Sequence, residues 1–417
     1  MNKILVILDG AADLPHPFLN GKTPLEAAEM PNLDFFSEYS CMGYMYPISE
    51  NVAPGSDNSL LSIFGNNPEI CKRGVLEAVG IGLNIKKGDI VFRTNFGTIE
   101  NLKTRKVIDR RVGRTLSSNE AKILAKDIND KIKLPCKFLF VPTIQHRGVL
   151  LFSGGNFSEN ITSIDPEWNG DNLDKSQENY FNFCSSLDNS LSSNYTSFLV
   201  NEFISQVFDI LNNHPLNFER IRKGLLPANM LFIRGGGTKV PKLKQYRNWM
   251  SINSMPLEIG ISKLSGMKVF SFDYPKQKSM DSYKNLYEGL YKNIKFFIKV
   301  IKKNHNIFRG CYIHFKEPDI PGHDNKPNEK RKILEFIDNN FFSFLKKFSL
   351  KHKFNLVVTC DHATPCKLKS HSSDFVPVMV YDGKNTDGTF HFCETIAKEG
   401  ILGKFYGKDF IKKTGLI

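Results

Sequence analysis

The sequence predicts an α/β protein with a mainly parallel sheet, and three observations carry that prediction. Short apolar segments of strand length lie at residues 4–8, 311–315 and 356–359, near both ends of the chain. Stretches that favour helix lie between them, the clearest being the amphipathic stretch 332–348. This alternation is typical of a parallel sheet covered by helices. Each apolar segment also leads into a loop rich in acids or histidine, and such sheets carry their chemistry beyond the carboxyl ends of the strands.

The length and composition of the chain limit the kinds of protein it can be. Its 417 residues correspond to about two to three domains, and 41% apolar with 24% charged residues are typical of a globular protein. The apolar runs are far shorter than the ~18 residues of a membrane span, so no membrane partner is expected. The first residues, MNKILVILDG, lack the features of a secretory signal. The eight cysteines are scattered without a C-x-x-C motif, so we expect reduced thiols and a cytoplasmic location.

The charge of the chain favours an anionic partner. There are 56 Lys and Arg residues against 43 Asp and Glu residues, which gives a net charge of +13. Such a surplus suits either a polyanion or a small anionic substrate. The densest basic tract, residues 292–303, has its apolar side chains at helical spacing. We therefore predict a helix packed on the core with a solvated basic face, and no nucleic-acid partner.

The middle of the chain predicts a second domain. Residues 86–165 contain shorter alternating stretches with turns between them, as in an antiparallel or α+β segment. Residues 170–197 are rich in Ser and Asn and predict a mobile loop, after which an amphipathic helix resumes at 201–213. The simplest architecture is a core domain of residues 1–68 and 238–417 with a smaller domain, 69–237, inserted between them. Hinges are expected near residues 60–75 and 235–245.

Metal-binding residue types follow the three predicted strands. Carboxylates and imidazoles are common ligands of divalent metals such as Mn²⁺ and Zn²⁺. Two ions about 4 Å apart would form a two-metal site for phosphoryl chemistry. Taken singly, each motif is more often a turn, a helix cap or a surface ion pair, but three at the strand ends of one sheet favour a metal site. The residues are Asp9, Asp319, His323, Asp361, His362 and His371.

A candidate nucleophile lies in the loop PGSDNS at residues 54–59. Ser56 precedes a stretch that looks like the start of a helix, where backbone N–H groups and the helix dipole favour an incoming phosphate. A metal bound to the hydroxyl would lower its pKa and make it a nucleophile. The alternative is that Ser56 or Asp57 only caps the helix.

These motifs together resemble the alkaline phosphatase superfamily, and within it the archaeal-type cofactor-independent phosphoglycerate mutases. The resemblance rests on ILDGAAD at the start, PGSD at 54–57, EPDIPGHD at 317–324 and CDHATPCKLKSHSSDFVPVMV at 360–380. Middle segments such as GDIVFRTNFGTI, VIDRRVGR, QHRGVLLFSG and HPLNFERIRKGLLPANMLFIRGGG agree with it. It implies an alkaline-phosphatase-like core with helices on both faces of the sheet and an inserted α+β domain.

The resemblance also implies roles for individual residues. One divalent ion would be held by Asp319, His323 and His371, and a second by Asp9, Ser56, Asp361 and His362. Mn²⁺ is the first choice, with Zn²⁺, Mg²⁺ and Co²⁺ left open. Substrate-binding and acid/base positions match Asp109, Arg110, Arg111, Arg114, His146 and Arg147. Weaker candidates of the same kind are Arg93, Arg234 and Lys263.

The implied activity is that of an isomerase of glycolysis and gluconeogenesis, which interconverts 3-phosphoglycerate and 2-phosphoglycerate without 2,3-bisphosphoglycerate. Ser56 would carry the phosphoryl group, and Asp109 would act as general base toward the retained glycerate. One position departs from the family: Leu60 stands where a His is usual, and Ser59 adds a second hydroxyl nearby. A metal-dependent phosphatase or phosphodiesterase of the same superfamily is the first alternative, and a basic nucleic-acid-binding protein is a more remote one. The sequence leaves the oligomeric state open.

Overall fold

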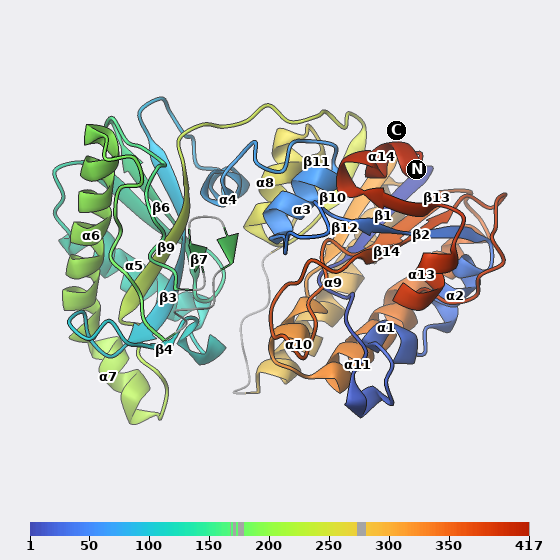
Figure 1. The fold of residues 1–417 in the computed structure, drawn as a ribbon, viewed down its shortest axis with the longest axis horizontal. Coiled ribbons are helices and arrows are strands. Elements are labelled where there is room, and N and C mark those ends of the chain that lie inside the picture. The colour runs from blue at the N-terminus through green and yellow to red at the C-terminus, as the bar shows by residue number, and fades with distance from the viewer. Residues whose placement is uncertain (167, 170–171, 174–178, 273–280, 417) are drawn as a thin grey trace.

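Two sheets, built from different parts of the chain, divide the molecule. The computed structural model describes residues 1–166, 168–169, 172–173, 179–272 and 281–416. Figure 1 shows the larger sheet on the right, with both chain termini, and the smaller sheet on the left. Two chain passages join these halves across the top of the view. Among the described residues, no helix combines the length and apolar character needed to cross a bilayer.

The large sheet has eight strands in the order β11-β10-β12-β1-β13-β14-β2-β15. All neighbouring pairs are parallel except the two pairs that involve β14, which confirms the predicted α/β class with a mainly parallel sheet. The strands are β1 (Lys3–Leu8), β2 (Ser40–Tyr46), β10 (Trp249–Ile252), β11 (Lys268–Phe270), β12 (Gly310–Phe315), β13 (Asn355–Thr359), β14 (Val376–Tyr381) and β15 (Gly403–Tyr406). The three strands predicted from the apolar segments, β12, β1 and β13, are neighbours near the centre of the large sheet.

Helices cover both faces of the large sheet. Because alternate side chains of a strand point in opposite directions, a single strand packs against helices on both faces. On β12, Tyr312 packs edge-on against Phe64 at the end of α3, whereas Phe315 packs against Phe297 of α9. The helices of this half are α1 (Pro24–Ala27), α2 (Pro31–Ser37), α3 (Ser56–Ile63), α8 (Pro256–Leu264), α9 (Ser282–Asn304), α10 (Asp319–His323), α11 (Pro327–Ile337), α12 (Ser343–Ser349), α13 (Glu394–Glu399) and α14 (Phe410–Lys413).

The smaller sheet is antiparallel, as the alternating middle segments predict. Its central strand, β3 (Ile90–Ile99), is buried along its whole length and pairs with β6 (Arg147–Ser153), β9 (Met230–Gly237) and β4 (Val107–Asp109). The remaining strand, β5 (Lys137–Pro142), pairs with β6. The other elements are α5 (Ser118–Lys131), α6 (Leu191–Asn212), α7 (Pro215–Arg222) and the short pair β7 (Trp168–Asn169) and β8 (Asn172–Leu173). Helices α5 and α6 pack on this sheet around an aromatic core that includes Phe92, Phe152 and Phe203.

Helix α4 (Arg73–Gly80) joins the two halves through backbone contacts. A Cβ atom on Gly80 would lie 1.9 Å from the carbonyl oxygen of Pro256, and one on Gly260 of α8 would lie 1.9 Å from that of Leu76. At the other end of α4, a Cβ on Gly74 would lie 2.6 Å from the carbonyl of Gly235 in β9. Glycine is therefore required where α4 meets each half, because any side chain would overlap the neighbouring backbone. The domain limits 1–68, 69–237 and 238–417 stay a prediction.

Two helices differ from their predicted bounds. Helix α6 begins at Leu191 instead of at residue 201, because the Ser190 side chain accepts a hydrogen bond from the Ser193 backbone and starts the helix within the Ser-rich stretch. Part of the predicted mobile loop is therefore helical, while its residues 170–171 and 174–178 lie outside the described residues. The predicted helix 332–348 is divided into α11 and α12 by a π-helical turn over Asp338–Phe342.

Candidate active site

Three strand ends meet at one edge of the large sheet. Strand β1 pairs in parallel with β12 on one side and with β13 on the other, so the carboxyl ends of all three lie together. Asp9 follows β1, Asp319 opens α10 after β12, and Asp361 follows β13. Asp9 and Asp361 are completely buried. The topology therefore gathers carboxylates that are hundreds of residues apart in the chain.

The first group of candidate metal ligands is Asp319, His323 and His371. Their ligand atoms lie within 4.8 Å of one another. The two oxygens of Asp319 each face one imidazole: Oδ2 lies 3.4 Å from Nε2 of His323, and Oδ1 lies 3.7 Å from Nε2 of His371. Asp319 and His323 are four residues apart on α10, so one helical turn places both side chains on the same face.

The second group surrounds Asp9. Nε2 of His362 lies 3.4 Å from Oδ1 of Asp9, 3.4 Å from Oδ2 of Asp361 and 3.2 Å from Oγ of Ser56. The chain bends after β13, so the adjacent residues Asp361 and His362 both face the site. All four residues predicted for the second ion are thus brought together. His314 on β12 joins them from the other side, with Nε2 3.0 Å from Oδ2 of Asp9.

The imidazole rings of the first group are held by their Nδ1 atoms. Nδ1 of His323 lies 2.9 Å from the carbonyl oxygen of Lys369, and Nδ1 of His371 lies 2.8 Å from that of Pro54. A carbonyl can only accept, so both rings carry their proton on Nδ1 and leave the Nε2 lone pair facing Asp319. This is how metal-binding histidines are usually oriented.

Thr364 links the two groups. Nδ1 of His362 lies 3.1 Å from the Thr364 hydroxyl, which in turn donates to Oδ1 of Asp319 at 2.7 Å. Thr364 is fully buried, so its hydroxyl cannot turn to water instead. It therefore fixes one ligand of each group at once.

The buried carboxylates fit the binding of cations. Among the described residues, Oδ1 of Asp9 and Oδ2 of Asp361 have no hydrogen-bond donor although both are buried. Burial and the negative charge of Asp9 raise the pKa of Asp361 to about 7. Unpartnered buried carboxylates are costly unless a cation accompanies them. Oxygen and imidazole donors of this kind suit divalent transition metals, so both groups fit a metal ion.

Lys316 brings a permanent positive charge to the second group. Its Nζ contacts Oδ2 of Asp9 and lies 3.1 Å from Oε1 of Glu258, which is fully buried on α8. Burial opposes the charged form, but Asp9 and Glu258 raise the pKa of Lys316 above its ordinary value. Burial would also raise the pKa of Asp9, yet Lys316 and the hydrogen bond to His314 hold it well below its usual range.

Ser56 lies at the first position of α3, with Gly55 as the capping residue. It does not cap the helix with its side chain, because its hydroxyl faces His362 instead. Ser59, the second hydroxyl, is fully buried one turn further on, and Leu60 packs in the hydrophobic core. The geometry therefore selects Ser56 as the hydroxyl that lines the cavity.

The inserted domain presents a wall of arginines. Arg93 on β3 is paired directly across the strands with Arg234 on β9, and Arg147 begins β6 on the other side of β3. Opposed like charges destabilise a sheet unless something compensates them. Glu77 lies 3.3 Å from Nε of Arg93, and Asp165 lies 3.4 Å from Nε of Arg234. Burial, with the charges of Arg73 and Arg110, lowers the pKa of Arg234 to about 10, although Asp165 opposes the shift.

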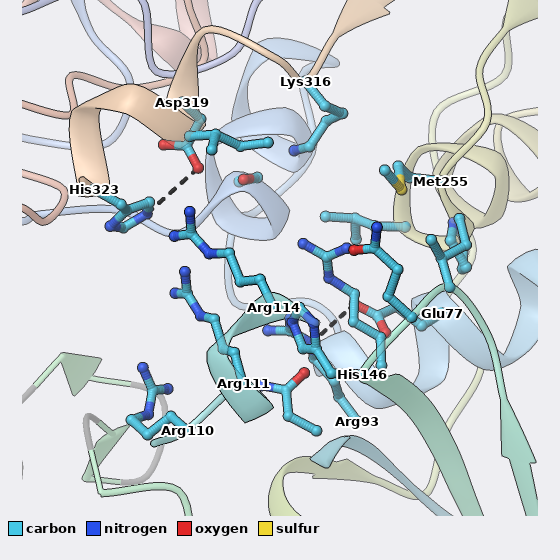
Figure 2. Close-up of a pocket in the computed structure, with 18 of the residues that line it drawn as sticks. Glu77, Arg93, Arg110, Arg111, Arg114, His146, Met255, Lys316, Asp319 and His323 are labelled. Atoms are coloured by element: carbon cyan, nitrogen blue, oxygen red, sulfur yellow. Dashed lines mark ion pairs between the residues drawn. The ribbon is translucent and has the colours of Figure 1, made fainter. Parts of the chain in front are cut away.

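The segment DRRVGR forms a turn at the edge of this wall. Oδ1 of Asp109 accepts hydrogen bonds from the backbone of Arg111 at 2.7 Å and of Gly113 at 2.8 Å. Arg110 is held by Asp165 through its Nε atom at 2.8 Å. Figure 2 shows Arg111 and Arg114 of this turn directed toward Asp319 and His323 of the core.

His146 lies under the arginines and is neutral. It is buried, and its Nδ1 has no hydrogen-bond partner among the described residues. Burial and then the charges of Arg147, Arg111 and Arg114 lower the pKa of His146 well below its ordinary value. A neutral imidazole in this position can donate or accept one hydrogen bond without adding charge.

One cavity of about 200 Å³ joins these parts. Figure 2 shows the arginines and His146 of the inserted domain on one side and Lys316, Asp319 and His323 of the core on the other. A more open groove of about 550 Å³ continues outward and includes Asp109. Lys263 is not brought to either space: its Nζ donates to the carbonyls of Val79 and Gly80 at the end of α4. The predicted residues that line the inner cavity are Ser56, Arg93, Arg110, Arg111, Arg114, His146, Arg147, Arg234, Asp319, His323 and His371.

Sequence reasoning missed several residues of the site. His314 and Lys316 are two apart across the end of β12, and this period-two spacing next to the metal motif was a usable signal. Asp165 and Glu258 gave no local signal, because each acquires its role only by facing an arginine or lysine from another element. Glu77 also pairs with Arg73 on its own helix, but its contact with Arg93 of β3 depends on tertiary packing. Thr364 and Asp324 likewise meet Asp319 and Arg114 only in the folded chain.

The chain is similar over nearly its whole length to known mutases. A model of the family "2,3-bisphosphoglycerate-independent phosphoglycerate mutase" matches residues 38–217. The protein of that name from Metallosphaera sedula is 34% identical over 409 residues, which cover 96% of this chain and 93% of the relative. The one from Thermococcus kodakarensis is 33% identical over 427 residues, with 98% and 95% covered.

Solved structures agree with these relatives. A protein from Pyrococcus horikoshii superposes with a TM-score of 0.71 at 27% identity, covering 99% of this chain and 97% of the other. The cofactor-independent phosphoglycerate mutase from Thermoplasma acidophilum gives a TM-score of 0.55 at 25% identity, with 100% and 99% covered. With the serine, the first metal-ligand group and the arginine wall lining one cavity, this chain belongs to the family of 2,3-bisphosphoglycerate-independent phosphoglycerate mutases.

Proposed function

We propose that the protein interconverts 3-phosphoglycerate and 2-phosphoglycerate without 2,3-bisphosphoglycerate, through a phosphoserine at Ser56. The observation that carries the proposal is the composition of the inner cavity. Ser56 and the first group of metal ligands line its core side, the second group contacts Ser56 through His362, and a wall of arginines lines the other side. A substrate with a phosphate at one end and a carboxylate at the other matches both sides. The excess of positive charge suits a small anionic substrate.

Two divalent ions would be held by the ligand groups described above, with Mn²⁺ as the first choice and Zn²⁺, Mg²⁺ or Co²⁺ as further possibilities. When bound, they would supply Lewis-acid stabilisation of the phosphoryl oxygens and of the serine oxygen. The chain itself supplies Ser56 at the N-terminus of α3, where helical N–H groups favour phosphate. Lys316 adds a largely buried positive charge beside Asp9 and favours the developing negative charge.

The arginine wall would retain glycerate between the two transfer steps. Guanidinium groups bind carboxylates through two parallel hydrogen bonds, which fixes the orientation of the intermediate. Arg93, Arg147 and Arg234 surround the inner part of the cavity, and neutral His146 can bond a glycerate hydroxyl. We assign Asp109 as the general base that removes the proton of the attacking hydroxyl. It lines the outer groove and also holds the DRRVGR turn in place.

The remaining parts of the proposal concern domain limits and location. We propose residues 69–237 as a substrate-binding domain that closes over the core, with hinges near residues 60–75 and 235–245. The eight cysteines are free thiols, which supports a reducing compartment such as the cytoplasm. No nucleic-acid partner is proposed.

A coupled assay tests the function. Purified protein with Mn²⁺ receives 3-phosphoglycerate without 2,3-bisphosphoglycerate, and 2-phosphoglycerate and free phosphate are followed together. We expect 2-phosphoglycerate without phosphate, and complete loss of turnover with EDTA or with Ser56→Ala. Ser59→Ala is the matched control, since it removes a nearby hydroxyl that does not line the cavity, and it should retain turnover. Free phosphate as the main product would instead identify a phosphatase built on the same metal site.

A further inference from the structure

An ion pair crosses between the two halves of the molecule next to the metal ligands. Arg114 belongs to the DRRVGR turn of the inserted domain, and Asp324 directly follows α10, beside His323. Nη1 of Arg114 lies 2.8 Å from Oδ1 and 2.9 Å from Oδ2 of Asp324. Both side chains are about three-quarters buried, with 24% and 26% exposed. A charged hydrogen bond of this kind, partly shielded from water, holds its partners more firmly than an exposed surface pair.

A third residue supports the carboxylate from the core. The hydroxyl of Tyr283, in the first turn of α9, donates to Oδ2 of Asp324 at 2.9 Å. Burial and the charge of Asp324 raise the pKa of Tyr283, so the phenol keeps its proton and acts as a donor. Tyr283 of the core thus orients Asp324, and the carboxylate of Asp324 pairs with Arg114 of the inserted domain.

The backbone of the turn leaves Arg114 little freedom to point elsewhere. Val112, Gly113 and Arg114 have φ values of 54°, 59° and 57°, so three consecutive residues adopt the left-handed conformation. For Val and Arg this conformation is strained and persists only where the surroundings impose it. Asp109 imposes it here by accepting from the backbone of Arg111 and Gly113.

The contact lies at the border between the inner cavity and the outer groove. Arg114 lines both spaces, and Asp324 lines the outer one. A substrate that reaches Ser56 by the groove passes this border, and so does any water that follows it. Whether Arg114 and Asp324 stay in contact therefore governs whether water can reach Ser56 once the substrate is inside.

We propose that Asp324 and Tyr283 are positioning residues that hold Arg114, and with it the inserted domain, against the core while Ser56 carries the phosphoryl group. In this way they set the ratio of phosphoryl transfer to hydrolysis. The inference rests on the proposed mutase function. In productive transfer, a glycerate hydroxyl oxygen bonds to phosphorus, the phosphorus–Oγ bond of Ser56 breaks, and the hydroxyl proton passes through the general base to the serine. In hydrolysis, water takes the place of glycerate: its oxygen bonds to phosphorus, the phosphorus–Oγ bond of Ser56 breaks, a water proton goes to the serine, and free phosphate leaves.

The test measures this ratio in the full-length protein loaded with Mn²⁺. Asp324→Asn keeps the shape but removes the charge that pairs with Arg114. We expect the ratio of free phosphate to 2-phosphoglycerate formed from 3-phosphoglycerate to rise about tenfold, the factor expected for the loss of one charged hydrogen bond. Labelled glycerate added during turnover should also enter the phosphoglycerate pool faster, because the bound glycerate escapes more often. Asp324→Glu, which restores the charge, should recover part of the ratio.

Two further variants make the result decisive. Tyr283→Phe removes a single oxygen that bonds Asp324 and should shift the ratio in the same direction by a smaller factor. Glu288→Gln is the matched control, because it neutralises a partly exposed carboxylate on the same helix that pairs with Lys292 at 2.7 Å, and it should leave the ratio unchanged. If Asp324→Asn does not fold by circular dichroism, Tyr283→Phe decides the question.

The outcomes separate this inference from the function on which it rests. A wild-type ratio in Asp324→Asn and Tyr283→Phe, with 2-phosphoglycerate still formed, would overturn the positioning role and leave the mutase function intact. A uniform loss of rate at constant ratio would also overturn it, since that is what a merely structural role produces. Wild-type protein that forms neither product would overturn the mutase function and this inference with it.

Discussion

Replacing Thr364 by valine would test whether the two metal-ligand groups are held by one hydroxyl. The change keeps the shape of the side chain, which packs closely against Gly10 and Gly322. It removes the bond to Asp319 at 2.7 Å and the bond with His362 at 3.1 Å. His362 is fully buried and Asp319 is largely buried, and an unsatisfied buried group costs about 1–3 kcal/mol. Loss of a residue that orients metal ligands typically lowers metal affinity about 10–100-fold.

The assay follows mutase turnover as a function of free Mn²⁺. For Thr364→Val we expect half-activation to need about 10–100 times more Mn²⁺ than for wild type, with turnover largely recovered at saturation. Thr364→Ser is the control, because it keeps the hydroxyl and loses only a methyl group, and it should stay near wild type. The reasoning is refuted if Thr364→Val and wild type are activated at the same Mn²⁺ concentration, since the hydroxyl would then orient neither ligand.

Three further changes probe the fold and the limits of the site. Gly260→Ala should lower the melting temperature, corresponding to about 1–3 kcal/mol, because its Cβ would lie 1.9 Å from the Leu76 carbonyl oxygen; an unchanged melting curve would show that α4 and α8 can separate freely. Burial alone would lower the pKa of His391. The hydrogen bond to Asp34 at 2.8 Å and the charge of Asp34 together outweigh burial, so the pKa lies above its ordinary value. Charged His391 therefore stabilises the fold fully at pH values below the ordinary pKa of histidine. This contribution is lost as the pH rises through the pKa of His391 in the folded protein. His391→Gln should thus cost about 1.5–3 kcal/mol of unfolding free energy near pH 5.5 and clearly less near pH 9, measured by urea titration; equal losses at both pH values would contradict the assignment. Lys263→Ala should leave the KM for 3-phosphoglycerate within about twofold of wild type and cost under ~1 kcal/mol, since its ammonium group bonds the end of a helix; a large rise in KM would place it in the site after all.

The central strands and most ligand positions could be predicted from the sequence, because local pattern and topology agree there. Apolar runs ending in Asp9 and Asp361 specify buried parallel strands, and parallel strands bring their carboxyl ends to one edge. The start of α6 was missed because Ser190, an N-cap, lies in a polar stretch that looks like a loop. Capping depends on one side chain and contributes little to average composition.

Most of the counter-charges could not be predicted. Glu258 and Glu77 are ordinary helical residues in sequence, and each faces a basic residue outside its own helix: Lys316, just after β12, and Arg93, on β3. Their pairing follows from how α4 and α8 pack between the sheets, which is a property of the tertiary structure. The side chain of Lys263 bonds a helix end instead of lining the cavity, and its predicted role in substrate binding stays a prediction.

The contacts of α4 determine how the two halves can move. Its backbone meets α8 at Gly80 and β9 at Gly74, so sliding along either surface would force backbone atoms into one another. A rigid-body motion that keeps both contacts is a rotation with α4 as the pivot. The displacement of a residue then grows with its distance from this helix. Arg73, which lies on the pivot, would stay nearly fixed against the core, while a residue at the outer border, such as Arg114, would sweep a longer arc.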